Sequence, residues 1–211
     1  MVVIRRAVGI GSELALNGAA AGGMALTANA SQGLSFSGVV GGTASLASLT
    51  AGGSGATTIG GGAITTQGAQ TFEGAVVLSA NTTLTGGAIA FDGSLDSDQA
   101  SNNRVVTLAS GGLKSFSGKV GGQAAFATLN ATGGGGVMVS GGSVKTTTQN
   151  YTSETVTLGA DSVFSGTTLN FGTINGNSRN LTLSATGTAT LTGVVSGVAD
   201  LVSDSGGTTV L

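Results

Sequence analysis

Internal repetition constrains this chain more than any other feature. The heptapeptide FSGVVGG at Phe36 returns as FSGKVGG at Phe116 and, in degraded form, as LTGVVSG at Leu191. The agreement extends beyond this motif, because residues 59–64 match residues 139–144 at the same offset that separates Phe36 from Phe116. Self-similarity at a fixed distance is the signature of an array of stacked structural units.

The repeats place the whole chain, residues 1–211, in a single segment of about two and a half long repeats. The middle copy spans residues 70–148, with partial copies at residues 12–69 and 149–211. Arg5 and Arg6 precede an apolar stretch that could pass for a signal peptide, but Glu13 interrupts it, and we interpret residues 12–30 as repeat. No run of 18 or more apolar residues occurs, so we expect no transmembrane helix and no membrane insertion.

The local hydrophobic pattern has a period of two. The triplets VTL at 106–108, VTL at 156–158 and LTL at 181–183 each place a threonine between two apolar residues. This alternation is typical of strands, and glycine pairs end the alternating runs. No segment keeps a helical period for a dozen residues, so the sequence predicts an all-β protein with short strands.

The spacing of the corners selects one fold among the β architectures. Phe72 and Phe91 open similar strand–glycine corners, and Phe171 and Leu191 do so at nearly the same separation. A sandwich or a barrel would not give such even corners nested within a longer repeat. We therefore predict a right-handed parallel β-helix, or β-solenoid, with about 20 residues per rung. The absence of proline agrees, because backbone N–H groups in such a coil donate to the next rung.

The aromatic residues fall on or beside the recurrent apolar positions, which indicates a stacked core rather than a platform for sugars or bases. We expect Phe36, Phe116 and Leu191 to point inward at equivalent positions along the rod, and Phe91 and Phe171 to be equivalent to each other. The predicted core residues are Phe36, Phe72, Phe91, Phe116, Phe126, Tyr151, Phe164, Phe171 and Leu191.

The recurrent elements resemble a known family. The FxGxVGG motif, the QTF and QNY openings at 70–72 and 149–151, and the LTGG and AFDG elements at 84–87 and 90–93 are similar to the β-strand repeats of filamentous-haemagglutinin-type adhesins. The resemblance covers residues 12–211. It implies a segment of a very large bacterial surface or secreted protein, exported by two-partner secretion or as an autotransporter-like passenger. The secretion domain of that family is not recognisable, so the resemblance implies an internal shaft segment at the cell surface or outside the cell.

Composition excludes several kinds of chemistry. With no histidine and no cysteine, catalysis by a histidine base or a cysteine nucleophile is excluded, as are the usual zinc sites. The net charge of −2 and the scattered basic residues argue against nucleic acid as a partner. We therefore expect no catalytic residue, no cofactor and no enzymatic activity. The lack of cysteine does not decide the redox compartment.

The acidic residues offer only a weak metal site. Asp92, Asp96 and Asp98 lie close together around the loop 94–104 and could form a weak Ca²⁺ loop, but a solvated loop is favoured. Sequons for glycosylation begin at Asn29, Asn81, Asn130, Asn150 and Asn180, and most reflect composition.

Alternating threonines raise ice binding as an alternative to an ordinary strand surface. Thr186, Thr188, Thr190 and Thr192 alternate along one segment, as do Thr146 and Thr148, and regular threonine arrays of this kind order water on ice-binding proteins. Outward threonine is also the ordinary choice for a strand surface, and the arrays do not recur at each predicted rung, so we favour the ordinary interpretation.

Three functional hypotheses remain open. The favoured one is a structural shaft or adhesive segment whose partner is a glycan or protein receptor on a host or neighbouring cell. The second is a self-assembling extracellular fibre subunit that associates end to end, because an open strand edge can pair with another chain. The third is a polysaccharide-acting β-helix enzyme, which would need a facing pair of carboxylates or a deep lateral groove.

Overall fold

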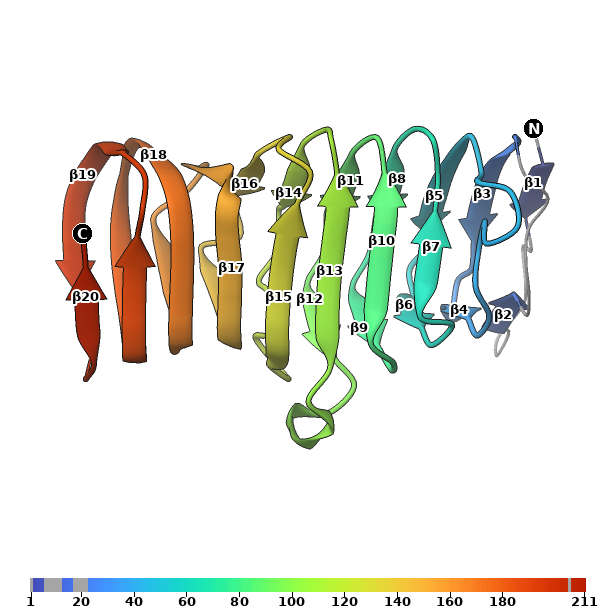
Figure 1. Cartoon of the computed structure of the whole chain (residues 1–211). Helices are drawn as coiled ribbons and strands as arrows, with labels where there is room; N and C mark the ends of the chain where they lie inside the picture. Colours follow the sequence, from blue (N-terminus) through green and yellow to red (C-terminus); the bar gives the residue numbers. More distant parts are fainter. Residues whose placement is uncertain (1, 6–12, 17–22, 205) are drawn as a thin grey trace.

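A computed structural model describes residues 2–5, 13–16, 23–204 and 206–211 of the chain. It is an all-β solenoid of about nine turns, about 20 residues apart, and every strand pairing is parallel. In Figure 1 the front strands run upward while the chain advances from right to left, so the coil is right-handed. The predicted fold class is confirmed.

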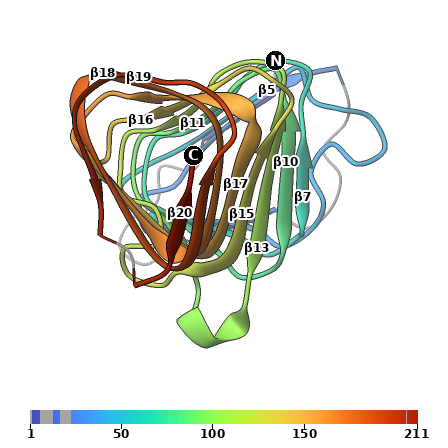
Figure 2. The ribbon, with the colours of Figure 1, turned by 60° about the vertical axis from the view of Figure 1, so that its left-hand side comes forward.

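Three faces make up each turn, as the view toward the C-terminal end shows (Figure 2). Face A, visited first, comprises β1 (Val2–Arg5), β3 (Ala25–Asn29), β5 (Ser48–Gly52), β8 (Gln70–Phe72), β11 (Ile89–Phe91), β14 (Lys114–Phe116), β16 (Val137–Val139) and the beginning of β19 (Val195–Ser203). Face B comprises β2 (Glu13–Leu16), β4 (Gly33–Phe36), β6 (Ala56–Ile59), β9 (Val76–Leu78) and β12 (Leu95–Ser97).

Face C lies at the front of Figure 1 and comprises β7 (Ala63–Thr65), β10 (Thr82–Gly86), β13 (Val105–Ser110), β15 (Phe126–Thr132) and β20 (Thr208–Val210). Two long strands, β17 (Ser143–Leu158) and β18 (Ser162–Leu191), pass round the corners and contribute to several faces. One short 3₁₀ helix, η1 (Ala100–Asn102), interrupts the described strands. No helix in the described part of the chain is long and apolar enough to span a membrane.

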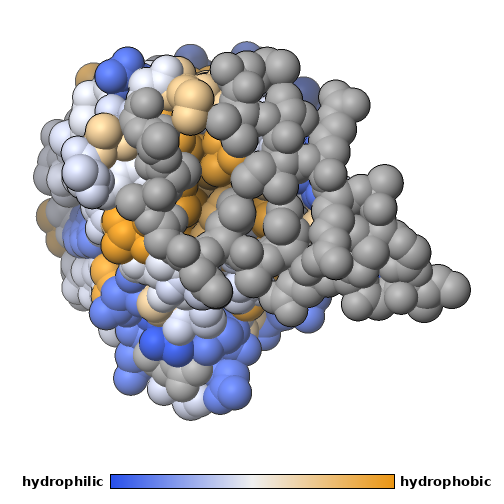
Figure 3. Space-filling view, turned by 90° about the vertical axis from the view of Figure 1, so that its right-hand side faces the viewer, coloured by the Kyte–Doolittle hydropathy of each residue, from blue (hydrophilic) through white to orange (hydrophobic). Residues whose placement is uncertain are grey.

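The period-two pattern sets which side chains enter the core. Along β13 the burial alternates strictly, and Val106 and Leu108 are buried while Thr107 between them is half-buried. Valine and threonine favour the pleated backbone, and stacking the apolar residues of successive turns removes them from water. Figure 3, which looks along the rod from the N-terminal side, shows hydrophobic residues in the middle of the cross-section and hydrophilic ones at its lower rim.

The nine predicted core residues are all buried, none more than 4% exposed. On face A the rings of Phe72, Phe91 and Phe116 form a continuous stack, with centroids 5.1 and 5.7 Å apart. Near the other end Tyr151 stacks on Phe171 at 5.3 Å. The aromatic residues thus lie in the core, where the sequence pattern predicts them.

The predicted equivalence of the repeat motifs is wrong. Phe36 lies on β4 of face B, Phe116 on β14 of face A, and Leu191 at the end of β18 on face C, where the N–H of Thr192 donates to Phe171 O at 3.0 Å. Phe91 and Phe171 likewise lie on different faces.

Unequal turns cause this displacement. Successive register partners on face A are Gln70, Ile89, Lys114, Val137, Val156 and Ile174, and the step from Ile89 to Lys114 is the longest of them. The offset between Phe36 and Phe116 therefore falls short of four full turns, and each long repeat is displaced by one face.

The glycines of the recurrent VGG motif are required by geometry. Gly41 and Gly121, the equivalent glycines of two copies, have φ angles of 70° and 65°. A side chain at either position would also meet a carbonyl oxygen of the next turn, from Thr65 or Lys145. Only glycine tolerates this combination of positive φ and close backbone approach.

The N-terminal segment is partly described. Strands β2 and β3 fall within residues 12–30, which we interpreted as repeat, and they pair with β4 and β5. Residues 12 and 17–22 of that interpretation lie outside the described residues.

Candidate functional site

The most unusual chemistry of the described chain lies inside the solenoid, where a lysine and a glutamate form an ion pair. Lys114 Nζ lies 3.2 Å from Glu154 Oε1, and both side chains are completely buried. Lys114 begins β14, and the register continues from it through Val137 to Val156, so the two charges come from turns separated by one intervening turn. The pair therefore joins three successive turns of the coil.

Backbone groups satisfy the rest of this ion pair. Lys114 Nζ donates to Ser110 O at 2.7 Å and to Gly112 O at 3.4 Å. The carboxylate of Glu154 accepts the N–H of Gly134 at 2.9 Å and that of Gly136 at 2.7 Å. Burying two charges is costly unless each is paired and fully hydrogen-bonded, and here both conditions are met.

A β-bulge accommodates Glu154. The register between β17 and β18 shifts between Tyr151 and Thr155, so the strand adjusts its backbone at this corner. From Glu154 onward the inward positions are Glu154, Val156 and Leu158, all of which are buried. An outer groove of about 340 Å³ runs beside the bulge and is lined mainly by threonine and glycine. The carboxylate itself is directed inward, toward Lys114, because its oxygens are engaged there.

Two buried glutamines, like the ion pair, are hydrogen-bonded to backbone carbonyl groups at the corners of the coil. Gln70 Nε2 donates to Ile64 O at 3.2 Å and to Thr85 O at 2.8 Å, while its Oε1 has no hydrogen-bond partner. Gln149 Nε2 donates to the carbonyl oxygens of Val144 and Ser165 at 3.1 and 3.0 Å. The Gln149 Oε1 accepts the hydroxyl of Tyr151 at 3.2 Å, and burial raises the pKa of that phenol well above its ordinary value. These interior polar groups join strands rather than face a ligand.

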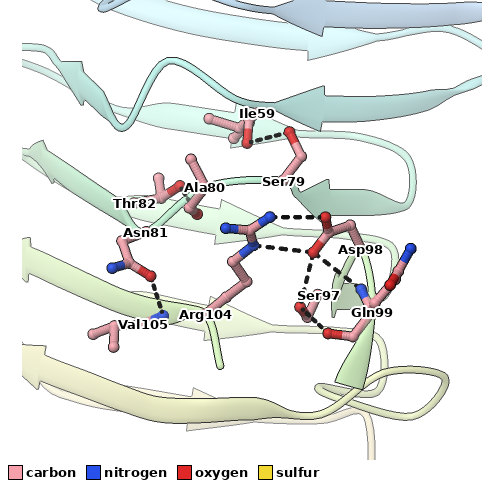
Figure 4. A network of polar contacts seen from close by, with 10 residues as sticks. All are labelled: Ile59, Ser79, Ala80, Asn81, Thr82, Ser97, Asp98, Gln99, Arg104 and Val105. Carbon is pink, nitrogen blue, oxygen red and sulfur yellow. Dashed lines mark hydrogen bonds and ion pairs between the residues drawn. The ribbon is translucent and has the colours of Figure 1, made fainter. Parts of the chain in front are cut away.

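The predicted loop 94–104 is only partly a loop, because residues 95–97 form the buried strand β12. The part that follows, residues 98–104, projects from the bottom of the rod near the middle of its length (Figure 1). At its base Arg104 forms a double contact with Asp98, Nε to Oδ1 and Nη2 to Oδ2, both at 3.0 Å (Figure 4). The N–H of Gln99 and the hydroxyl of Ser97 also donate to Asp98 Oδ1, at 3.0 and 3.3 Å. Hydrogen bonding to Asp98 raises the pKa of the Arg104 guanidinium. The contacts tie the two ends of the projecting loop together.

The three aspartates proposed as a Ca²⁺ loop have separate surroundings. Asp92 is exposed at a corner, whereas Asp96 is buried and its Oδ1 accepts the N–H groups of Gln123 and Ala124 at 2.9 and 3.5 Å. Asp98 is engaged by Arg104. Among the described residues, no three acidic, histidine or cysteine side chains gather into a group that could hold a metal ion.

A hollow of about 400 Å³ lies beside this loop, and Asp96 and Asp98 both line it, with Gln123 and Ala124 at its edge. The hollow thus has two carboxylates in its lining, the feature that the enzyme hypothesis needs. Both carboxylates already have protein partners, because one caps backbone N–H groups and the other binds Arg104.

The sequence reasoning missed the buried ion pair. A detectable signal existed, because Lys114 lies two residues before Phe116, at the inward position that Gln70 and Ile89 occupy before Phe72 and Phe91. Glu154 likewise shares the inward parity of Val156 and Leu158. That the two residues meet depends on the stacking of turns.

The fold and this interior define the class of protein as a parallel β-solenoid with a buried ion pair, Lys114–Glu154, in its core. None of the family models, curated proteins or solved structures with which we compared the chain matches it.

Proposed function

We propose that the chain is a rigid structural rod, a shaft segment of a large bacterial surface or secreted adhesin. The observation that carries the proposal is the unbroken core, in which apolar residues of successive turns stack along the described coil and the interior polar groups cross-connect those turns. A coil of this kind extends by about 4.8 Å per turn, so about nine turns reach about 40 Å. Stacked turns transmit length and stiffness while loops stay exposed for contact.

The resemblance to filamentous-haemagglutinin-type repeats supports an extracellular location and a role in attachment. In this proposal the rod carries the projecting loop 98–104 outward, where its tip can meet a glycan or protein receptor on a neighbouring cell. Electron microscopy and small-angle scattering of the purified chain test the rod. We expect elongated particles whose length matches the stack of turns, and compact globules would contradict the proposal.

A second function, self-assembly into fibres, is favoured by one specific feature. Leu201 and Val202 on β19 and Val210 on β20 are 42%, 42% and 46% exposed on the last turn. An apolar strand edge of this kind can pair with a strand from another molecule. Sedimentation velocity over a range of concentrations tests this, and a monomer at every concentration would exclude end-to-end assembly of the purified chain.

The enzyme alternative rests on the hollow beside Asp96 and Asp98. Its test is an assay of the purified chain against a broad panel of polysaccharides. Turnover that is abolished in the double variant Asp96→Asn/Asp98→Asn would contradict a purely structural role. A variant with Asp92→Asn is the matched control, because Asp92 is exposed outside the hollow.

A further inference from the structure

Face C carries a two-dimensional array of short polar side chains that the coil brings into register. Thr128 pairs with Thr148, which pairs with Thr168, and farther along Thr188 pairs with Thr208. Thr188 follows Thr168 at the same interval, one turn of the coil, and Thr186 of the same strand lies 3.4 Å from Thr167 of the preceding turn. One column of threonine thus runs along the rod over five successive turns.

A second column lies two residues farther along each strand. Asn150 Nδ2 donates to Asn130 Oδ1 at 2.7 Å, and Asn170 Nδ2 donates to Asn150 Oδ1 at 2.8 Å. Asn130 Nδ2 in turn donates to the hydroxyl of Thr107 at 3.3 Å, and Thr190 continues the column. We name the two columns the Thr–Asn face. It consists of Thr107, Thr128, Asn130, Thr148, Asn150, Thr168, Asn170, Thr188 and Thr190, which are half-buried, and of Thr208, which is exposed.

The Thr–Asn face is rigid. The amide ladder fixes the asparagine side chains to one another, and threonine is stiff at χ1 because it is branched at Cβ. Neighbouring turns lie about 4.8 Å apart, and alternate residues of a strand lie about 6.7 Å apart. The outward hydroxyl, methyl and amide groups therefore form a lattice with two fixed repeats.

The Thr–Asn face is also free of charge. None of the strands β10, β13, β15 and β20 contains a charged residue, and neither do residues 146–151, 166–171 and 186–191 of the long strands. The charged residues of the same turns lie at corners, on other faces or in the core, as Lys145, Glu154 and Asp161 do. In Figure 1 the strands of face C lie at the front of the rod. The chain thus keeps strongly hydrated ions off one broad, regular surface.

We propose that the Thr–Asn face binds ice. Its two repeats are close to the oxygen spacings on the prism planes of hexagonal ice, so water held by the hydroxyl and amide groups can join the crystal in register. Threonine methyl groups between them order the same water without competing hydrogen bonds. Charged groups would hold water in arrangements that do not match ice, and this surface has none. The regularity across turns exceeds what the sequence suggested, because each column follows the stacking direction rather than one strand.

The test is partition of the purified chain into a growing ice shell, together with inhibition of ice recrystallisation. We expect the chain to be incorporated into ice and to keep its crystals small. Thr168→Lys, at the centre of the threonine column, should abolish both effects, and Thr148→Lys, one turn away, should do the same. Thr71→Lys is the matched control, because Thr71 is a half-buried threonine at the centre of β8 on face A, and it should retain both effects.

Circular dichroism and thermal melting of each variant establish that it is folded before its ice affinity is compared. Exclusion of the unmodified chain from ice would overturn the proposal, whatever the variants do. Equal activity of folded Thr148→Lys and the unmodified chain would overturn the assignment to this face. Binding to crystalline cellulose without binding to ice would also overturn the proposal that this face binds ice. A rod with no affinity for ice would leave the structural function intact, so the two proposals fail separately.

Discussion

Single residues in this protein have unusually uniform surroundings, because each inward side chain rests on its counterparts in the turns before and after it. Phe116 illustrates this, since it stacks on Phe91 with the ring planes 11° apart and is 1% exposed. When a side chain in such a column is truncated, its neighbours are held in place by the turns above and below, so they cannot move to fill the cavity. The cost of a truncation there should approach the upper part of the range for buried aromatic residues.

Truncation of Phe116 to alanine should lower the free energy of unfolding by about 3 to 5 kcal/mol. Urea unfolding followed by circular dichroism measures the change. The control is Ser115→Ala on the same strand, whose side chain points outward, and its effect should stay within about 0.5 kcal/mol. A loss below that value for Phe116→Ala would mean that the column does not form.

Tyr151 gives the folded state a specific sensitivity to alkali. Burial raises the pKa of its phenol in the folded protein, so above about pH 10 the unfolded chain releases this proton while the folded chain retains it. The unfolded state then binds fewer protons, and stability must fall as the pH rises. Below the unfolded pKa the group is neutral in both states and has no such effect.

The expected result is a steeper alkaline loss of stability in the unmodified chain than in Tyr151→Phe. Urea midpoints measured from about pH 8 to about pH 11 give the two slopes, and their difference isolates the tyrosine from the lysines. Parallel slopes would show that the phenol is not held neutral in the core.

At the scale of elements, the decisive contact is the ion pair between β14 and β17. Strand pairing in a solenoid is repetitive, and repetitive pairing leaves register weakly specified. A buried charge can be satisfied in only one alignment of the turns, because Glu154 needs Lys114 as well as the N–H groups of Gly134 and Gly136. We therefore expect the pair to select which turn stacks on which, at some expense in stability relative to an apolar core.

Replacing Lys114 alone by methionine should destabilise the fold by about 3 to 5 kcal/mol, because Glu154 would remain buried without its partner. The double variant Lys114→Met/Glu154→Met should recover most of this loss. Thermal unfolding of both variants measures the difference, with the exposed Lys145→Met as the control. Equal destabilisation in the single and double variants would indicate that the pair contributes net stability rather than alignment.

At the scale of the whole molecule, strand pairing joins each turn to its immediate neighbours, and the Lys114–Glu154 pair reaches across one intervening turn. Stability is therefore close to a sum of turn and interface terms. Central turns have a neighbour on both sides, whereas the last turn, formed by β19 and β20, has one. Its residues are mostly exposed, in contrast to the alternating burial of β13 and β15.

Amide hydrogen exchange of the full chain should therefore be graded along the rod. Amides of β11, β13 and β14 should exchange most slowly, and those of β19 and β20 fastest among the strands of the C-terminal half. Mass spectrometry of peptic fragments reports the gradient. Uniform protection along the coil would indicate either a fully cooperative unit or association that covers the last turn.

The sequence by itself determined the fold class and the core. Stacking strands in a coil has three local consequences: a period of two, evenly spaced glycine corners and a lack of proline. All three can be recognised in the amino-acid sequence alone. The aromatic positions follow from the same pattern, and so does the inward parity of Lys114 and Glu154. The Thr-x-Asn motif, which recurs once per turn from Thr128, is also present in the sequence. It can be recognised only when segments one turn apart are compared, and not along a single strand.

Only the tertiary structure decided which residues share a face. Turns of unequal length accumulate a phase difference, so the copies of one motif at Phe36 and Phe116 face different sides of the rod. The meeting of Lys114 with Glu154 depends on that accumulated phase and on the bulge after Tyr151. The Thr–Asn face exists for the opposite reason, because the later turns keep a constant length on face C and their threonines and asparagines stay in line.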